Sequence, residues 1–235
     1  MVELGRKNNL RIVKEVSFGL YLDGGQAGEI LLPSRYIPEK FETGEFLDVF
    51  IYKDSEDRII ATTETPKIMV GEFALLTVKS VEQNGAFLDW GLMKDLLVPF
   101  NEQQVRMEKK KKYIIRTYID ESSERIAGSS RIEKYLDLEP HNYNEGQEVD
   151  ILIVNQTDIG YKVIINNSHS GIIYQNEIFT QIERGKKYKA YIKKIREDQK
   201  IDVCLNKPGF EKIDHLSDKI LDILRKGNGF LPLTD

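Results

Sequence analysis

Short runs of β-branched and aliphatic residues recur three times along this chain in the same order. The first unit opens on Gly5, and a second glycine, Gly19, follows 14 positions later. The same pair returns at the same spacing in two later places, at Gly71 and Gly85 and at Gly146 and Gly160. Between the glycines of each pair lies a β-type run, in 10–16, 73–81 and 149–154, whose partial alternation predicts a half-buried strand.

Four further strands follow in each unit. The second glycine, which lets the chain bend sharply, opens a short strand, and these strands cover 19–23, 85–90 and 160–165. Third strands are predicted at 30–33, 96–99 and 172–175, fourth strands at 44–51, 110–116 and 185–192, and closing strands after a charged turn at 59–62, 126–129 and 201–205. Five short strands in roughly 65 to 75 residues, with a longer connection after the third, are typical of a five-stranded Greek-key barrel.

The fold class is therefore all-β, with three tandem barrels of the oligonucleotide-binding type. We expect them at 1–65, 66–138 and 139–208, with Pro66 breaking the strand pattern at the first boundary. A short helical turn and a link rich in proline and asparagine lie within 131–144. Apolar residues at spacings of three and four after Gly209 predict an amphipathic helix, so 209–235 is interpreted as the start of a further small domain.

Composition narrows the class of protein. Hydrophobic residues make up 40% and charged residues 31% of the 235, and no stretch approaches the roughly 20 apolar residues of a membrane helix. The N-terminus shows no secretion signal, and the single cysteine, Cys204, suits a reducing cytoplasm. We expect Cys204 to be a small core residue. The three histidines are too scattered for a metal site, so no metal or cofactor is expected.

Charge is unevenly distributed although the net charge is only −4. Residues 1–66 carry 8 basic and 12 acidic side chains, whereas 141–208 carry 10 and 9. Lysine runs lie at 109–112 and 186–189, where a solvated loop or strand edge is the simpler interpretation. The balance argues against indiscriminate binding of duplex nucleic acid through a strongly basic surface.

Aromatic and cationic residues accompany the second and third strands, whose outer face carries the ligand in this class of barrel. A binder of single strands combines rings for stacking with cations along the phosphates. The candidate rings are Phe18, Tyr21, Phe87, Trp90, Tyr161 and Tyr174. The candidate phosphate contacts are Lys14, Lys79, Lys162, Lys193 and Lys194. Each ring has a competing role as a core residue, which is the commoner fate of an aromatic side chain on a strand.

Each unit resembles the RNA-binding domain named after ribosomal protein S1. The order of three such barrels, then a helix and the segment Gly-Phe-Leu-Pro-Leu-Thr-Asp at 229–235, is similar to the conserved virulence factor B family of bacterial regulators. This resemblance covers essentially the whole chain. It implies that 209–235 is the first helix and turn of a winged-helix domain. It also implies a bacterial RNA-binding protein that regulates gene expression, with single-stranded RNA as its partner.

The signature positions of the S1 domain carry over unevenly. The first aromatic is Phe18, but Asn84 and Ile159 stand there in the later units. The second aromatic falls on Tyr21, Phe87 and Lys162, and the histidine on Leu32, Val98 and Tyr174. The charged turn supplies Arg58, Arg125 and Lys200 as further RNA contacts. No unit has the full set, so we expect weak single barrels that bind cooperatively as an array.

Three other functions compete with RNA binding, and of these an enzyme is not expected. An enzyme needs a nucleophile or base with an orienting partner, and the sequence offers no phosphate loop, no Ser/His/Asp order and no clustered metal ligands. A platform that contacts ribosomal or transcription proteins is the serious alternative, because the first unit is acidic and signature aromatics are missing. Binding of DNA would need the completed winged-helix domain.

Overall fold

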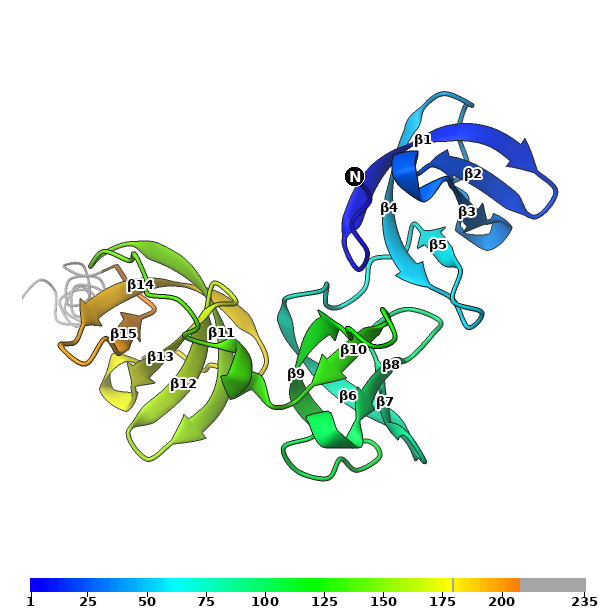
Figure 1. Ribbon diagram of the computed structural model, residues 1–235. Coiled ribbons are helices and arrows are strands. Elements are labelled where there is room, and N and C mark those ends of the chain that lie inside the picture. The colour runs from blue at the N-terminus through cyan, green and yellow to red at the C-terminus, as the bar shows by residue number, and fades with distance from the viewer. Residues whose placement is uncertain (179, 208–235) are drawn as a thin grey trace, which may run out of the picture. The chain divides into compact units, whose positions relative to one another are not determined.

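The computed structural model describes residues 1–178 and 180–207. The secondary structure of these residues consists of β-strands and short 3-10 turns. The strands form three five-stranded units that follow one another along the chain (Figure 1). The strands of the first unit are β1 (Lys7–Val16), β2 (Gly19–Asp23), β3 (Glu29–Pro33), β4 (Phe46–Lys53) and β5 (Ile59–Thr62). Those of the second are β6 (Phe73–Glu82), β7 (Gly85–Asp89), β8 (Leu96–Pro99), β9 (Lys112–Ile119) and β10 (Ile126–Ser129). Those of the third are β11 (Glu148–Thr157), β12 (Gly160–Ile165), β13 (His169–Tyr174), β14 (Lys187–Ile195) and β15 (Ile201–Cys204).

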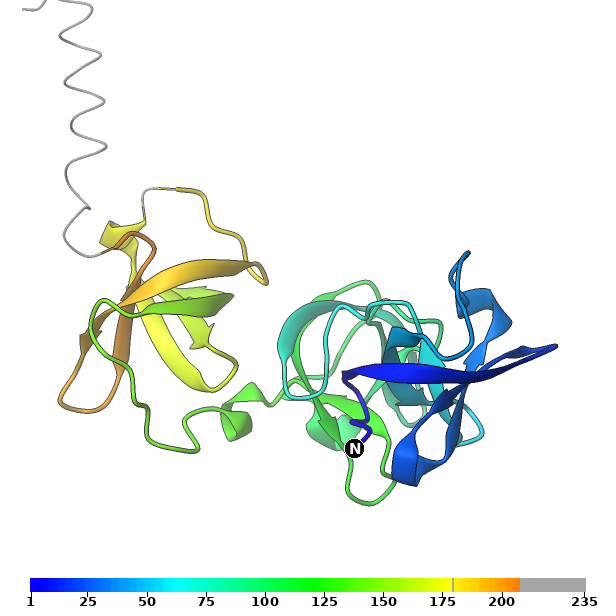
Figure 2. The same ribbon diagram turned by 90° about the horizontal axis from the view of Figure 1, so that it is seen from above.

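Strand order confirms the predicted architecture. The first and third units are closed barrels with the orders β1-β2-β3-β5-β4 and β11-β12-β13-β15-β14. Figure 2 shows the third barrel, coloured yellow-green to orange, from above. The second unit has the equivalent order, β10-β9-β6-β7-β8, but β8 and β10 are not joined by a ladder. Side chains fill that seam, because a Cβ added at Gly128 would lie 2.9 Å from Cγ2 of Val98 and 2.8 Å from Cγ2 of Ile115.

The first strand of each unit carries a bulge at the same place. The register shifts between Ile12 and Lys14, between Val78 and Ser80, and between Ile153 and Asn155. One extra residue per unit, Val13, Lys79 or Val154, increases the local twist and bends the strand. The bulge therefore helps the long first strand to pair with both of its neighbours, as β1 does with β2 and β4.

Close backbone contact explains the second glycine of each pair more fully than the bend alone. A Cβ at Gly19, Gly85 or Gly160 would lie 2.2, 2.3 or 2.0 Å from the carbonyl oxygen of Leu32, Val98 or Ile173, respectively. No side chain fits at such a distance, so the second strand can approach the third this closely only where glycine stands. Because this glycine meets the carbonyl group of an equivalent residue in every unit, the second and third strands pair in the same register in all three.

That register corrects one predicted alignment. Gly160 pairs with Tyr174, just as Gly19 pairs with Pro33 and Gly85 with Pro99. The third-unit equivalent of Leu32 and Val98 is therefore Ile173, whereas Tyr174 is the equivalent of Pro33 and Pro99, so the predicted alignment combined two positions that differ by one residue. Leu32, Val98 and Ile173 are all fully buried, so this position serves the core in every unit.

The chain divides into two compact units, Met1–Tyr135 and the part from Leu136 onward. Within the first, the core of the second barrel extends onto the outer face of β4 and β5, where Phe50, Tyr52 and Ile60 pack against it. The third barrel has a separate core, and Cys204 is buried with 1% of its surface exposed, as predicted.

Helical structure in the described residues is limited to short 3-10 turns, among them η2 (Ser34–Tyr36), η3 (Phe100–Glu102) and η4 (Ile132–Tyr135). No helix in this part of the chain is long and apolar enough to cross a membrane. The predicted helix and winged-helix start at 209–235 lie outside the described residues.

Candidate nucleic-acid interface

The first barrel brings three of the predicted residues together. Phe18 lies in the turn between β1 and β2 with 54% of its surface exposed, and its ring meets that of Tyr21 edge to face at 6.3 Å. Lys14 is the cross-strand neighbour of Tyr21, and its Nζ lies 4.9 Å from the ring centroid. The cluster presents an exposed ring beside a half-buried ring and a cation, which are the elements that hold a base and its phosphate.

The charged turn after β4 is stabilised by its own side chains. Asp54 accepts hydrogen bonds from the backbone N–H groups of Glu56 and Arg58, and its Oδ2 lies 2.8 Å from Nε of Arg58. Burial alone would raise the pKa of Asp54, but these hydrogen bonds hold it below its usual range. Arg58 is thereby fixed on the surface of the first barrel.

The second barrel holds Phe87 in a cleft of about 960 Å³. Phe87 is half-buried on β7 between its cross-strand neighbours Ser80 and Leu97. Lys79, the bulge residue of β6, forms an ion pair of 2.7 Å with Asp95, and this hydrogen bond raises the pKa of Lys79. Since Asp95 also lines the cleft, Lys79 and Phe87 flank the same region.

Trp90 does not present an exposed ring beside Phe87 for a base to stack on, but takes the competing role of a buried aromatic residue. It is 3% exposed, and its ring meets that of Phe50 of the first barrel edge to face at 5.8 Å. Its Nε1 donates a hydrogen bond to the carbonyl oxygen of Lys94. The first two barrels meet at a contact surface, here called the joint, in which Trp90 is buried against Phe50. The large apolar surface of the indole stabilises this joint.

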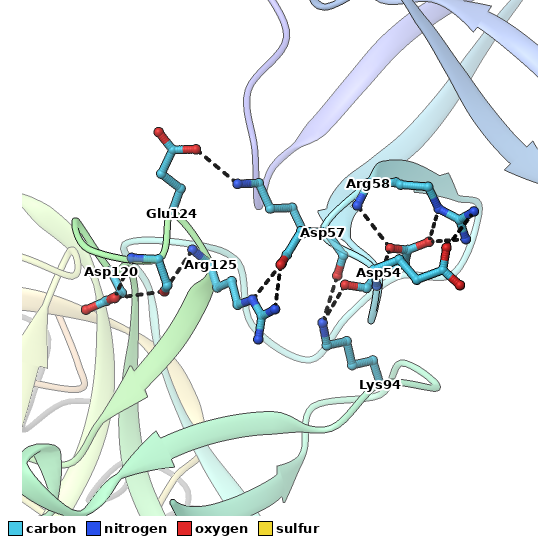
Figure 3. A network of polar contacts seen from close by, with 10 residues as sticks. Asp54, Asp57, Arg58, Lys94, Asp120, Glu124 and Arg125 are labelled. Atoms are coloured by element: carbon cyan, nitrogen blue, oxygen red, sulfur yellow. Dashed lines mark hydrogen bonds and ion pairs between the residues drawn. The ribbon is translucent and has the colours of Figure 1, made fainter.

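Arg125 lies at the same joint. Its Nε and Nη2 each lie 2.6 Å from a carboxylate oxygen of Asp57, which belongs to the charged turn of the first barrel. Lys53 and Glu124 form a second ion pair of 3.0 Å across the joint (Figure 3). Arg125 therefore lines the cleft while it holds the first barrel in place.

The predicted rings of the third barrel are less exposed than Phe18. Tyr161 is half-buried and packs against the barrel core, which is the structural role weighed against stacking. Lys162, at the position of Tyr21 and Phe87, is half-buried on β12 and lies opposite Asn155. At the preceding turn, Ile159 replaces Phe18 and leaves 58% of its surface exposed.

Tyr174 belongs to a polar cluster that the sequence did not indicate. Its hydroxyl accepts a hydrogen bond from Arg196, whose guanidinium also binds Asp202 through Nε at 2.9 Å and Nη2 at 2.6 Å. Asp202 is 8% exposed, and Arg196 supplies the cation that a nearly buried carboxylate needs nearby. Arg196 occupies the turn position of Asp54 and Asp120, where an arginine was not foreseen.

The remaining predicted cations lie on β14 and the turn that follows it. Lys193 forms an ion pair with Glu177, and Lys200 pairs with Asp198 at 2.8 Å. Lys194 is exposed and lies opposite Asp202 in the β14–β15 ladder. Together with Arg196, they make this edge the most basic part of the predicted interface in the third barrel.

Most of the predicted cations lie beside carboxylates. Lys14, for example, forms an ion pair of 2.6 Å with Glu29, and both side chains are about half exposed. Exposed pairs of this kind contribute little to stability, so a phosphate can replace the carboxylate at low cost. The arrangement suits moderate, salt-sensitive binding.

The cleft that contains Phe87 is also lined by four residues that the sequence analysis did not identify: Tyr118, Tyr135, Lys134 and Lys94. Tyr118 and Tyr135 lie 6.1 Å apart, and Nζ of Lys134 lies 4.9 Å from the Tyr135 ring. Tyr118 occupies the β9 position that corresponds to Tyr52 in β4, so the repeat could have found it. Tyr135 and Lys134 lie in η4, outside the repeated strands, and no repeat signal marks them.

Known proteins resemble this chain in sequence. The S1 domain family matches residues 4–64. A relative named uncharacterized protein YitL, from Bacillus subtilis strain 168, is 25% identical over 243 residues, covering 98% of this chain and 80% of the relative. Two Staphylococcus epidermidis relatives named conserved virulence factor B are 22% and 20% identical, over 92% and 84% of this chain and 76% and 68% of their own lengths. The resemblance to that family is thereby confirmed.

A solved structure is also similar along most of the chain. It is a multidomain protein with nucleic acid binding domains from Streptococcus pneumoniae. It is 20% identical, with a TM-score of 0.47, and the match covers 98% of this chain and 84% of the other.

Proposed function

We propose that this chain, which resembles conserved virulence factor B, binds single-stranded RNA across its three barrels without catalysing a reaction. The cluster of Lys14, Phe18 and Tyr21 carries the proposal. It lies on the outer face of the first barrel, in the segment that matches the S1 domain family, and it combines exposed aromatic surface with a cation. By the same resemblance, the protein acts in the bacterial cytoplasm as a regulator of gene expression.

Avidity supports the use of three unequal barrels. The first has the exposed ring, the second has the cleft around Phe87, and the third has the basic edge of Lys193, Lys194 and Arg196. Linked sites raise the local concentration of the next contact, so weak sites can hold one strand together. Binding by the array should therefore exceed binding by any one barrel.

Fluorescence anisotropy with labelled U-rich and A-rich single strands, beside a matched duplex, tests the proposal. We expect micromolar or tighter binding to single strands that falls steeply between low and moderate salt, because phosphate contacts release counterions. The combined variant Phe18→Ala, Phe87→Ala, Tyr174→Ala should lose most of this binding. Absence of binding at low salt would contradict the proposal.

A platform for ribosomal or transcription proteins is the second candidate. The observation in its favour is Ile159, an exposed aliphatic residue at the position of Phe18. The acidic excess of the first barrel points the same way. An apolar protein contact should change little with salt, so the same salt series separates the two functions.

A further inference from the structure

Lys94 joins the second barrel to the first through backbone groups. It lies in the connection between β7 and β8, and its Nζ donates hydrogen bonds to the carbonyl oxygens of Lys53 at 3.1 Å and Asp54 at 2.8 Å (Figure 3). An ammonium group has three donors, so these two contacts leave one for a further partner. The side chain is half-buried and lines the cleft that contains Phe87.

The carboxylates nearest to Lys94 are already engaged. Asp54 binds Arg58 at 2.7 Å, and Asp57 binds Arg125 at 2.6 Å. Among the described residues, Lys94 forms no ion pair of its own, and burial, followed by the charge of Arg125, lowers its pKa. The charges of Asp57 and Asp54 act on Lys94 from a distance, but its direct hydrogen bonds go to neutral carbonyl groups. A half-buried cation with a donor left over is a favourable place for an anion.

Both barrels contribute to the cleft around this cation. Tyr52 and Lys53 come from β4 of the first barrel, whereas Phe87 and Leu97 come from β7 and β8 of the second. Its volume, about 960 Å³, is at the upper end of the usual range for ligand pockets and can hold a nucleotide. The wall formed by Tyr52 and Lys53, and the hydrogen bonds that hold Lys94 in place, exist only while the two barrels are docked.

We propose that the first two barrels form one composite site, in which Lys94 binds a phosphate of a single RNA strand whose base reaches Phe87. This inference rests on the proposed function and adds a residue and a geometry to it. Because Lys94 also donates to Lys53 and Asp54, the phosphate contact and the docking of the barrels are coupled. If docking of the two barrels increases the affinity for RNA, then bound RNA must stabilise the docked arrangement by the same factor.

The first test compares Lys94→Met with Lys40→Met in the full chain. Lys40 is exposed on the first barrel and lies outside the cleft, so it controls for loss of one positive charge. We expect Lys94→Met to weaken binding of a U-rich strand roughly tenfold at low salt, as for loss of one charge-assisted hydrogen bond. The slope of log affinity against log salt should fall by about 0.7, as for one single-strand phosphate contact.

A second readout uses the wild-type chain and does not depend on the folding of a variant. Saturation with RNA should slow amide hydrogen exchange in residues 53–58, the turn whose carbonyl groups bind Lys94. In Lys94→Met, the same RNA should leave exchange in this turn unchanged.

The outcomes distinguish the two proposals. A wild-type chain that binds no single-stranded RNA contradicts the proposed function, and the composite site with it. If the wild type binds, but Lys94→Met matches Lys40→Met in affinity and salt slope, only the composite site is overturned. Unchanged exchange in 53–58 at RNA saturation also overturns it.

Discussion

Arg125 of the second barrel donates two parallel hydrogen bonds to Asp57 of the first, from Nε and Nη2 at 2.6 Å each. The two residues come from equivalent charged turns, after β4 and after β9. A bidentate pair fixes orientation as well as distance. The ring contact between Phe50 and Trp90 forms the apolar part of the joint. The Arg125–Asp57 pair and the two hydrogen bonds from Lys94 to carbonyl groups form its polar part.

The joint should respond to acid through Asp57. Hydrogen bonds from Arg125 hold the pKa of Asp57 below its usual range. A depressed folded pKa contributes stability that is present above the unfolded pKa, about 3.9, and is lost as the pH falls through the folded value. We therefore expect the joint to loosen below about pH 4. The emission of Trp90, the single tryptophan of the chain, reports this directly because its ring contacts Phe50.

Two variants test whether Asp57 is the group whose protonation loosens the joint. Asp57→Asn should shift the Trp90 emission at pH 6 towards its acid value and remove the corresponding step. Asp198→Asn is the matched control, because the pKa of Asp198 is likewise lowered by a hydrogen bond, from Lys200, but it lies in the third barrel. An identical acid step in Asp57→Asn and wild type would contradict this account of the joint.

Gly85→Ala should destabilise the second barrel through a backbone clash. The added Cβ would lie 2.3 Å from the carbonyl oxygen of Val98 and 2.9 Å from Cα of Pro99, and neither can rotate away. We expect a loss of at least about 2 kcal/mol in the free energy of unfolding, in the range of overpacked cores. Urea unfolding measures it.

Gly44→Ala is the control for the glycine variant. Gly44 has a φ of +98° but open space around its Cα, so alanine there meets only the conformational penalty, about 1 kcal/mol. If both variants unfold at the same urea concentration, close contact is not the reason for glycine at position 85.

Lys110→Gly should stabilise the chain. Lys110 has a φ of +67°, at the position where the other barrels have Gly44 and Gly185. All three N–H groups donate to an equivalent carbonyl, that of Ile12, Val78 or Ile153. Glycine removes the left-handed penalty of a side chain, so we expect a gain of up to about 1 kcal/mol in urea unfolding. Lys109→Gly, at a neighbour without positive φ, should lower stability instead.

Glycine spacing made the strands predictable, because a close contact that only glycine permits recurs in every barrel. The joint was not predictable. Phe50, Tyr52 and Ile60 have the alternation of ordinary strand residues, and nothing local shows that their outer faces are covered by a second barrel. The equivalent positions in the third barrel carry Tyr191, Lys194 and Asp202, which are more polar.

Some residues of the candidate site were predictable from the sequence and others were not. Phe18, Tyr21 and Lys14 come together because they are neighbours across one hairpin, which the repeat predicts. Lys94 could not be found from its own sequence neighbourhood, since its partners are carbonyl groups about 40 residues earlier in a different barrel. Tyr174 was aligned with Leu32 and Val98 instead of Pro33 and Pro99, since the third unit has no proline to mark the end of its third strand.

Phe18 offers the most direct test of the first barrel as an RNA contact. Its ring is 54% exposed and supports no barrel core, so Phe18→Ala should leave the unfolding transition nearly unchanged. One stacked base contributes about 1–3 kcal/mol, so the affinity for a U-rich strand should fall by roughly 5- to 150-fold. Phe46→Ala is the matched control, because Phe46 is 65% exposed on β4 of the same barrel, away from the second and third strands. Anisotropy that shows equal affinities for the two variants would remove Phe18 from the interface, whereas a loss confined to Phe18→Ala would place a base on its ring.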